Sequence, residues 1–226
     1  MKGWFFAICM YSSMTLFVTS GLGEDLDSPP LPSDLAGLAA RADLVAVIQV
    51  LDTDYEYTRD FPSGGTAFLK VLIPYKVTRP PEDIVEVYEE GLHAHECYFP
   101  DPSVLEEGRR FLVFLRLSDD VEDQYNGMEQ GCALEIFVTT DNRYALGAPL
   151  LGLHLTRDYL EHAVPLEFSD AHALMSYEEL ASEQRTAWLD AGWLVKADSH
   201  YRRTHGVELG VFRKLLEIDP LAARGR

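Results

Sequence analysis

The chain has 226 residues, with 19 Lys and Arg against 37 Asp and Glu, and its formal net charge is −18 at pH 7. Hydrophobic residues make up 47% of it, which excludes a wholly disordered or collagen-like protein. The acidity excludes a nucleic-acid partner, because wrapping a polyanion needs clustered Lys and Arg. The length allows one core domain with an appended region.

Residues 1–20 have the order of a secretory signal peptide. Lys2 is followed by an apolar stretch over residues 4–18 and then by small residues around Ser20, near which we expect cleavage. An uncleaved membrane anchor is the alternative, although hydroxyl side chains dilute a stretch that would need roughly 20 apolar residues to span. The leader predicts a secreted or periplasmic protein, with membrane contact only if the leader is retained.

Residues 21–33 are acidic and rich in Pro, as is typical of a linker. Ser33 is a candidate N-cap for a short helix that carries Leu35, Leu38 and Ala39 on one side.

Residues 34–148 read as a small β-domain. Continuous apolar runs are separated by Gly and Pro turns, one of them around Pro62, Gly64 and Gly65, and no helical periodicity is visible. We expect an acidic turn over 118–127 and about five strands, which lie at 44–57, 68–77, 84–88, 109–117 and 133–146. The pattern predicts an α+β fold that is mainly β in its first half, with a five-stranded OB-like antiparallel barrel.

Residues 149–226 differ in character. Apolar residues near helical spacing predict one helix over 177–198 and a second over 206–218. We therefore expect a C-terminal helical extension after the barrel.

Two cysteines remain once the leader is removed. An even pair in an exported chain predicts a disulfide between Cys97 and Cys132, with two buried free thiols as the alternative.

The sequence from residue 33 to residue 147 resembles secreted bacterial proteins of the netrin-like, TIMP-like type. The resemblance rests on LAARADLVAVIQV, FLKVLIPYKV and EEGRRFLVFL, with Cys97 ahead of Gly108. It implies an OB-like barrel and an extracytoplasmic binding role. Inhibitors of that family reach a protease zinc through a Cys directly after the leader, whereas this chain has Glu24 and Asp25 there.

His93 and His95 are the candidate metal ligands. Alternate residues of a strand share a face, so both imidazoles could reach one zinc or copper ion. A pair of histidines beside a disulfide without metal is the alternative, because a zinc site needs further ligands.

Two groups of carboxylates are weaker candidates. The acidic segment could hold calcium through Asp119, Asp120, Glu122, Asp123 and Asn126, or form a solvated turn. Asp52, Asp54 and Glu56 alternate on one strand face and suit either acid–base chemistry or a charged, protective edge.

The C-terminal 31 residues carry seven Lys or Arg against four acids, unlike the rest of the chain. Arg202, Arg203, Arg213 and Lys214 form a candidate interaction patch, and internal pairing with the acidic barrel is the alternative. No complete catalytic motif is present, and no resident cofactor is expected. The sequence thus favours a non-enzymatic binding module for an envelope or extracellular protein or glycan, with a metal-binding protein or metalloenzyme centred on His93 and His95 as the alternative.

Overall fold

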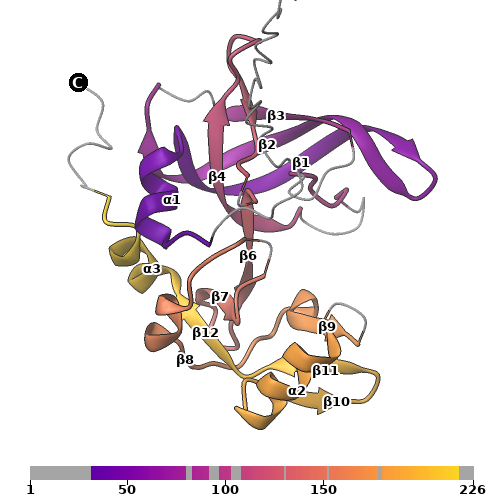
Figure 1. Ribbon diagram of the computed structural model, residues 1–226, viewed down its shortest axis with the longest axis vertical. Helices are drawn as coiled ribbons and strands as arrows, with labels where there is room; N and C mark the ends of the chain where they lie inside the picture. Colours follow the sequence, from indigo (N-terminus) through magenta and orange to yellow (C-terminus); the bar gives the residue numbers. More distant parts are fainter. Residues whose placement is uncertain are drawn as a thin grey trace, which may run out of the picture.

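The structure is a computed structural model, and it describes residues 32–79, 83–91, 97–102, 108–129, 131–151, 153–177 and 180–218. The expected leader and most of the expected linker lie outside these residues. The described part has the predicted α+β fold, dominated by strands (Figure 1).

Five strands close into a barrel, in the order β1-β2-β3-β5-β4 with a further pairing of β1 to β4. All of the pairings are antiparallel except that of β3 with β5, which is parallel. The closed five-stranded barrel confirms the OB-like prediction. The strands are β1 (Leu44–Thr58), β2 (Phe61–Val77), β3 (Ile84–Glu90), β4 (Arg110–Leu117) and β5 (Gln124–Asn126).

Strand β1 is apolar on both faces because each face meets a separate core. Leu44, Ala46 and Ile48 belong to one buried cluster, with Leu69, Val85, Val113 and Tyr125 from the other barrel strands. Val45 and Val47 belong to a second cluster, with Leu38 of helix α1 (Leu35–Arg41) and Phe212 of helix α3 (Leu209–Leu215). A continuous apolar run is the expected signature of a strand covered on both sides.

Two expectations about the barrel were wrong. The fifth barrel strand is the short β5, which lies inside the segment that we expected to be an acidic turn. The β1–β2 turn lies at Arg59 and Asp60, so that Gly64 and Gly65 belong to β2. Gly65 is needed inside the strand, because its φ is +121° and a Cβ there would lie 2.1 Å from the Asp54 carbonyl oxygen.

The segment expected to hold the last barrel strand instead extends the sheet beyond the barrel. Strand β6 pairs with β4, and β7, β12 and β8 follow it in order. A separate three-stranded sheet has the order β10-β11-β9. These strands are β6 (Ala133–Val138), β7 (Tyr144–Ala148), β8 (Val164–Pro165), β9 (Leu174–Ser176), β10 (Leu194–Ala197), β11 (His200–Arg203) and β12 (His205–Glu208).

The C-terminal region is less helical than expected. Helix α2 covers only Ser182–Asp190 and ends near Gly192, whose φ is +74°, and the extended strands β10 and β11 follow it. Residues 206–208 pair with β7, so α3 begins at Leu209. Two 3₁₀ segments, at Asp158–His162 and Ala171–Ala173, complete the region.

Helices α1 and α3 cover the same side of the barrel (Figure 1). The N-cap of α1 is Asp34 rather than Ser33, because the Asp34 carboxylate accepts a hydrogen bond from the Gly37 N–H at 2.6 Å. Lys76 of β2 donates from Nζ to the Ala39 and Ala40 carbonyls at 2.9 and 2.8 Å. Its charge thus satisfies the carbonyl end of the helix and joins it to the barrel.

Candidate functional site

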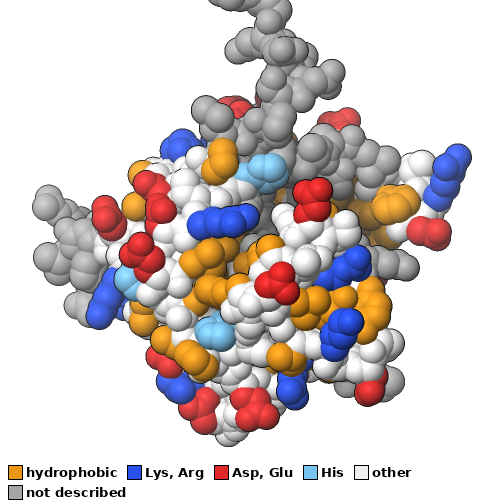
Figure 2. Space-filling model, turned by 60° about the horizontal axis from the view of Figure 1, so that its bottom comes forward, with side chains coloured by type: hydrophobic (Ala, Val, Ile, Leu, Met, Phe, Trp, Pro, Cys, Tyr) orange, Lys and Arg blue, Asp and Glu red, His pale blue; other side chains and the backbone are white. Residues whose placement is uncertain are grey.

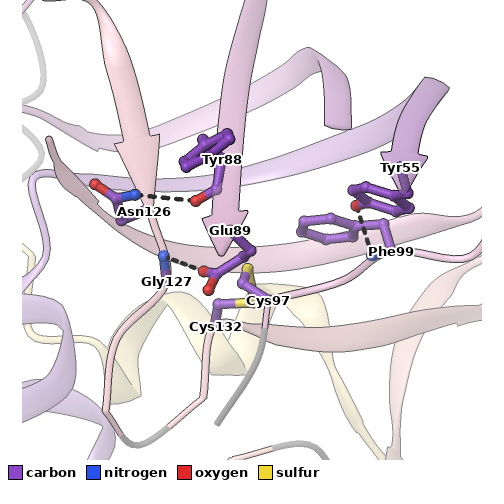
Figure 3. The surroundings of a disulfide bond; sticks show 8 residues. All are labelled: Tyr55, Tyr88, Glu89, Cys97, Phe99, Asn126, Gly127 and Cys132. Carbon is purple, nitrogen blue, oxygen red and sulfur yellow. Dashed lines mark hydrogen bonds between the residues drawn. A yellow bond between two sulfur atoms is a disulfide. The ribbon is translucent and has the colours of Figure 1, made fainter. Parts of the chain in front are cut away.

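The two cysteines proposed as a pair, Cys97 and Cys132, are joined by a disulfide with a Cα–Cα distance of 5.6 Å. Both are buried, and the Glu89 side chain lies next to them (Figure 3). Glu89 Oε1 accepts a hydrogen bond from the Gly127 N–H at 2.9 Å. A Cβ on Gly127 would lie 2.7 Å from both Cys97 Cβ and Glu89 Oε1. A glycine at position 127 therefore allows the chain leaving β5 to pass close to the disulfide.

The disulfide also fixes a segment that supports the outer part of β1. The Phe99 N–H, two residues after Cys97, donates to the Tyr55 hydroxyl at 3.0 Å (Figure 3). The Tyr55 and Tyr98 rings meet edge to face, with their centroids 5.1 Å apart. Burial raises the pKa of Tyr55 to about 12, although the hydrogen bond from Phe99 opposes the rise. These contacts hold β1 rigidly just before its hairpin turn.

The β1–β2 hairpin projects from the barrel beyond this support, as the arm on the right of Figure 1 shows. We define the hairpin tip as residues 57–61. Two large aromatic side chains are exposed there, Tyr57 to 54% and Phe61 to 65%. The turn between them is polar, and Arg59 has a left-handed φ of 61°. Exposed aromatic side chains on a supported element are typical of binding surfaces, because little conformational entropy is lost when they are buried.

The acidic side chains of β1 lie next to the hairpin tip. Asp52, Asp54 and Glu56 are exposed, whereas Thr53 and Tyr55 alternate with them and contact the segment that follows Cys97. The three carboxylates therefore flank the aromatic tip with negative charge. Their exposure suits long-range attraction of a basic partner.

The four basic residues of the expected patch do not form one surface. Arg203 is only 6% exposed, and its guanidinium lies over the Phe137 ring at 5.0 Å. Arg202 is exposed on β11, whereas Arg213 and Lys214 are exposed on α3, and Arg213 lies over the Tyr75 ring. Lys and Arg side chains are scattered among acidic ones over the face shown in Figure 2. Two of the four thus pack against aromatic rings of the protein itself.

The candidate metal ligands His93 and His95 lie outside the described residues. Among the residues that are described, no three His, Cys, Asp or Glu side chains come together as a metal site. In the acidic segment, Asp123 pairs with Arg79 and Asn126 Nδ2 donates to the Tyr88 carbonyl at 2.9 Å. Those two candidate calcium ligands are used to join β3, β5 and the end of β2.

Sequence reasoning did not single out Tyr57 or Phe61. The signal that could have found them is a pair of aromatic residues on either side of a charged turn, Thr58-Arg59-Asp60, which cannot both reach a core. The expected turn around Gly64 concealed this arrangement by placing the hairpin end several residues too late.

Comparison of the chain with protein-family models, with curated proteins and with solved structures gives no match. Among the described residues, none of the helices is both long and apolar enough to cross a bilayer. The buried disulfide is compatible with an oxidising, extracytoplasmic compartment, where such bonds persist.

Proposed function

We propose that this protein is an exported, non-enzymatic binding module with a netrin-like, TIMP-like barrel, which docks an envelope or extracellular protein through its hairpin tip. The observation that carries the proposal is the exposure of Tyr57 and Phe61 on a hairpin whose base is held by the Cys97–Cys132 disulfide and Tyr55. Large aromatic residues dominate binding energy at protein interfaces.

The charge around the tip defines the kind of partner. Acidic side chains outnumber the single basic one, Arg59, around the tip; they are Asp52, Asp54, Glu56 and Asp60. We therefore expect a partner surface with an apolar pocket for the aromatic rings and a basic rim around it. The rim charges speed association, whereas the aromatic side chains determine how long the complex lasts. The disulfide and the expected leader both support an encounter outside the cytoplasm.

Site-specific photo-crosslinking in the native envelope tests the proposal. A photoreactive phenylalanine analogue replaces Phe61 in one variant and Tyr144 in the other, a matched control whose aromatic ring is exposed on β7. We expect one discrete adduct from position 61 and none of that mass from position 144. The proposal fails if position 61 gives no adduct or if both positions give the same set.

Variants of the tip then measure its contribution to binding of the captured partner. We expect Tyr57→Ala with Phe61→Ala to weaken binding by about 30-fold or more, which corresponds to roughly 2 kcal/mol for an interface hot spot. Asp52→Asn with Asp54→Asn should instead lower the association rate and its dependence on salt. Equal binding by the aromatic double variant and the wild type would contradict the proposal.

A further inference from the structure

A concave surface lies away from the hairpin tip, on the face of β4 and β6 that carries Phe111, Glu135 and Phe137. A pocket of about 250 Å³ is lined by apolar residues together with Glu135 and Arg203. Its apolar walls include Phe111, Phe137, Leu150 and Leu151. Ligand sites in proteins have this character, with mostly apolar and aromatic walls and a few polar groups. A pocket of this volume suits a small molecule.

Glu135 lies at the junction between this pocket and a polar one of about 240 Å³, which it lines together with Arg109, Asp170 and His172. It is directly opposite Phe111 in the pairing of β6 with β4. Its side chain is 19% exposed, and burial raises the pKa of the carboxyl, an effect that Arg109, His172 and Arg203 partly offset. A desolvated carboxylate in a pocket is a candidate ligand-binding group.

The hydrogen bonding of Glu135 is asymmetric. Oε1 receives the Nε–H of Arg109 and forms an ion pair with its Nη2. In the part of the chain that the structure describes, Oε2 has no donor within hydrogen-bonding distance. A carboxylate oxygen that has no donor from the protein and lines a pocket can accept a hydrogen bond from a donor brought by a ligand.

The charges around Glu135 select against ionic ligands. The guanidinium groups of Arg109 and Arg203 lie close to it, and they would repel a cationic ligand from the pocket. At Glu135 Oε2, an anionic group would meet the carboxylate and would bring no proton to donate. A neutral ligand avoids both costs and also avoids the desolvation penalty of a buried charge.

From these observations we propose that this pocket binds a small neutral molecule with an apolar, aromatic body and one hydroxyl group. The body packs against the Phe111 and Phe137 rings, and the hydroxyl donates to Glu135 Oε2. A phenol has this combination of features. The proposal does not depend on the hairpin tip and stands if the proposed function fails.

Titration of the full chain with 4-ethylphenol, followed by amide chemical shifts, tests the proposal. We expect saturable binding, with the largest shifts at Glu135, Phe137 and Leu151. The matched probe 4-ethylanisole has a methyl ether in place of the hydroxyl donor, and we expect it to bind about tenfold more weakly, because a hydrogen bond to a charged group is lost. No saturation at millimolar concentration, equal binding of the two probes, or shifts confined to other residues would overturn the proposal.

Three variants locate the site. Glu135→Gln removes the charge and should weaken 4-ethylphenol binding by about tenfold, whereas Glu86→Gln on the exposed side of β3 should leave it unchanged. Ala133→Leu fills the pocket two residues before Glu135 and should abolish binding even if Glu135→Gln does not fold. N-acetyltyrosinamide carries the same phenol on a peptide backbone. Tighter binding of it than of 4-ethylphenol would show that the site takes a tyrosine of another protein and would overturn the small-molecule assignment.

Discussion

Tyr55 is the residue whose environment most clearly links the barrel to the hairpin tip. Its ring lies between the base of the tip and the segment that the disulfide holds, and its hydroxyl accepts the Phe99 N–H. A phenylalanine would keep the packing but leave that N–H without an acceptor. Such a buried donor costs about 1–3 kcal/mol.

We therefore predict that Tyr55→Phe lowers the free energy of unfolding at neutral pH by about 1–3 kcal/mol, as measured by denaturant titration. The folded pKa of Tyr55, about 12, exceeds the usual tyrosine pKa of 10.0. The contribution of the hydroxyl is therefore complete below pH 10 and is lost as the pH rises from 10 to 12. The difference in the free energy of unfolding between the wild type and Tyr55→Phe should therefore become smaller from pH 10 to pH 12. Tyr57→Phe, at an exposed ring, is the control, and an equal response of both variants would contradict the prediction.

The elements show which parts of the fold could be predicted from the sequence. Strands β1 and β4 were predicted closely, because long apolar runs buried on both sides leave few alternatives. Strand β5 could not be predicted, because only Tyr125 of its three residues is buried and its parallel neighbour β3 lies far earlier in the sequence. The helix expected over 177–198 was too long, because pairing of β10 with β11 outweighs local helical spacing.

Contacts between segments that are distant in sequence also limited what could be predicted of the candidate site. Cysteine count and compartment were enough to propose the Cys97–Cys132 pair. The pocket around Glu135 depends instead on β6 lying beside β4 and on Arg203, which follows Glu135 by 68 positions. A local sequence pattern cannot predict a pocket whose walls come from segments far apart in the chain.

At the level of an element, the C-terminal end of α1 is stabilised by hydrogen bonds from Lys76 of strand β2. Lys76→Met keeps the aliphatic stem but removes the donors to the Ala39 and Ala40 carbonyls. We predict a loss of about 1–3 kcal/mol in the free energy of unfolding, since a charged hydrogen-bond donor is removed. Lys70→Met changes an exposed lysine of the same strand and should have little effect. A similar loss in both variants would show that the helix does not need this contact.

At the scale of the whole molecule, the disulfide connects the segment after β3 to the start of β6 across 35 positions. We predict that Cys97→Ala with Cys132→Ala lowers the free energy of unfolding by about 2–4 kcal/mol. The Phe99 amide should also exchange its hydrogen faster, because its segment loses its attachment. Reductant should lower the stability of the wild type alone, and a double variant as stable as the oxidised wild type would refute the prediction.

The first and last described helices share one core, since Leu35 and Leu38 of α1 lie in the same buried cluster as Phe212 and Leu216 at the end of α3. Strand β12, which leads into α3, also completes the sheet next to β7. During synthesis, the segment up to β7 therefore emerges from the ribosome before the residues that cover its outer face. This cluster can close only after residue 216 has been made, so the side of the barrel that α1 and α3 cover stays open until α3 has emerged.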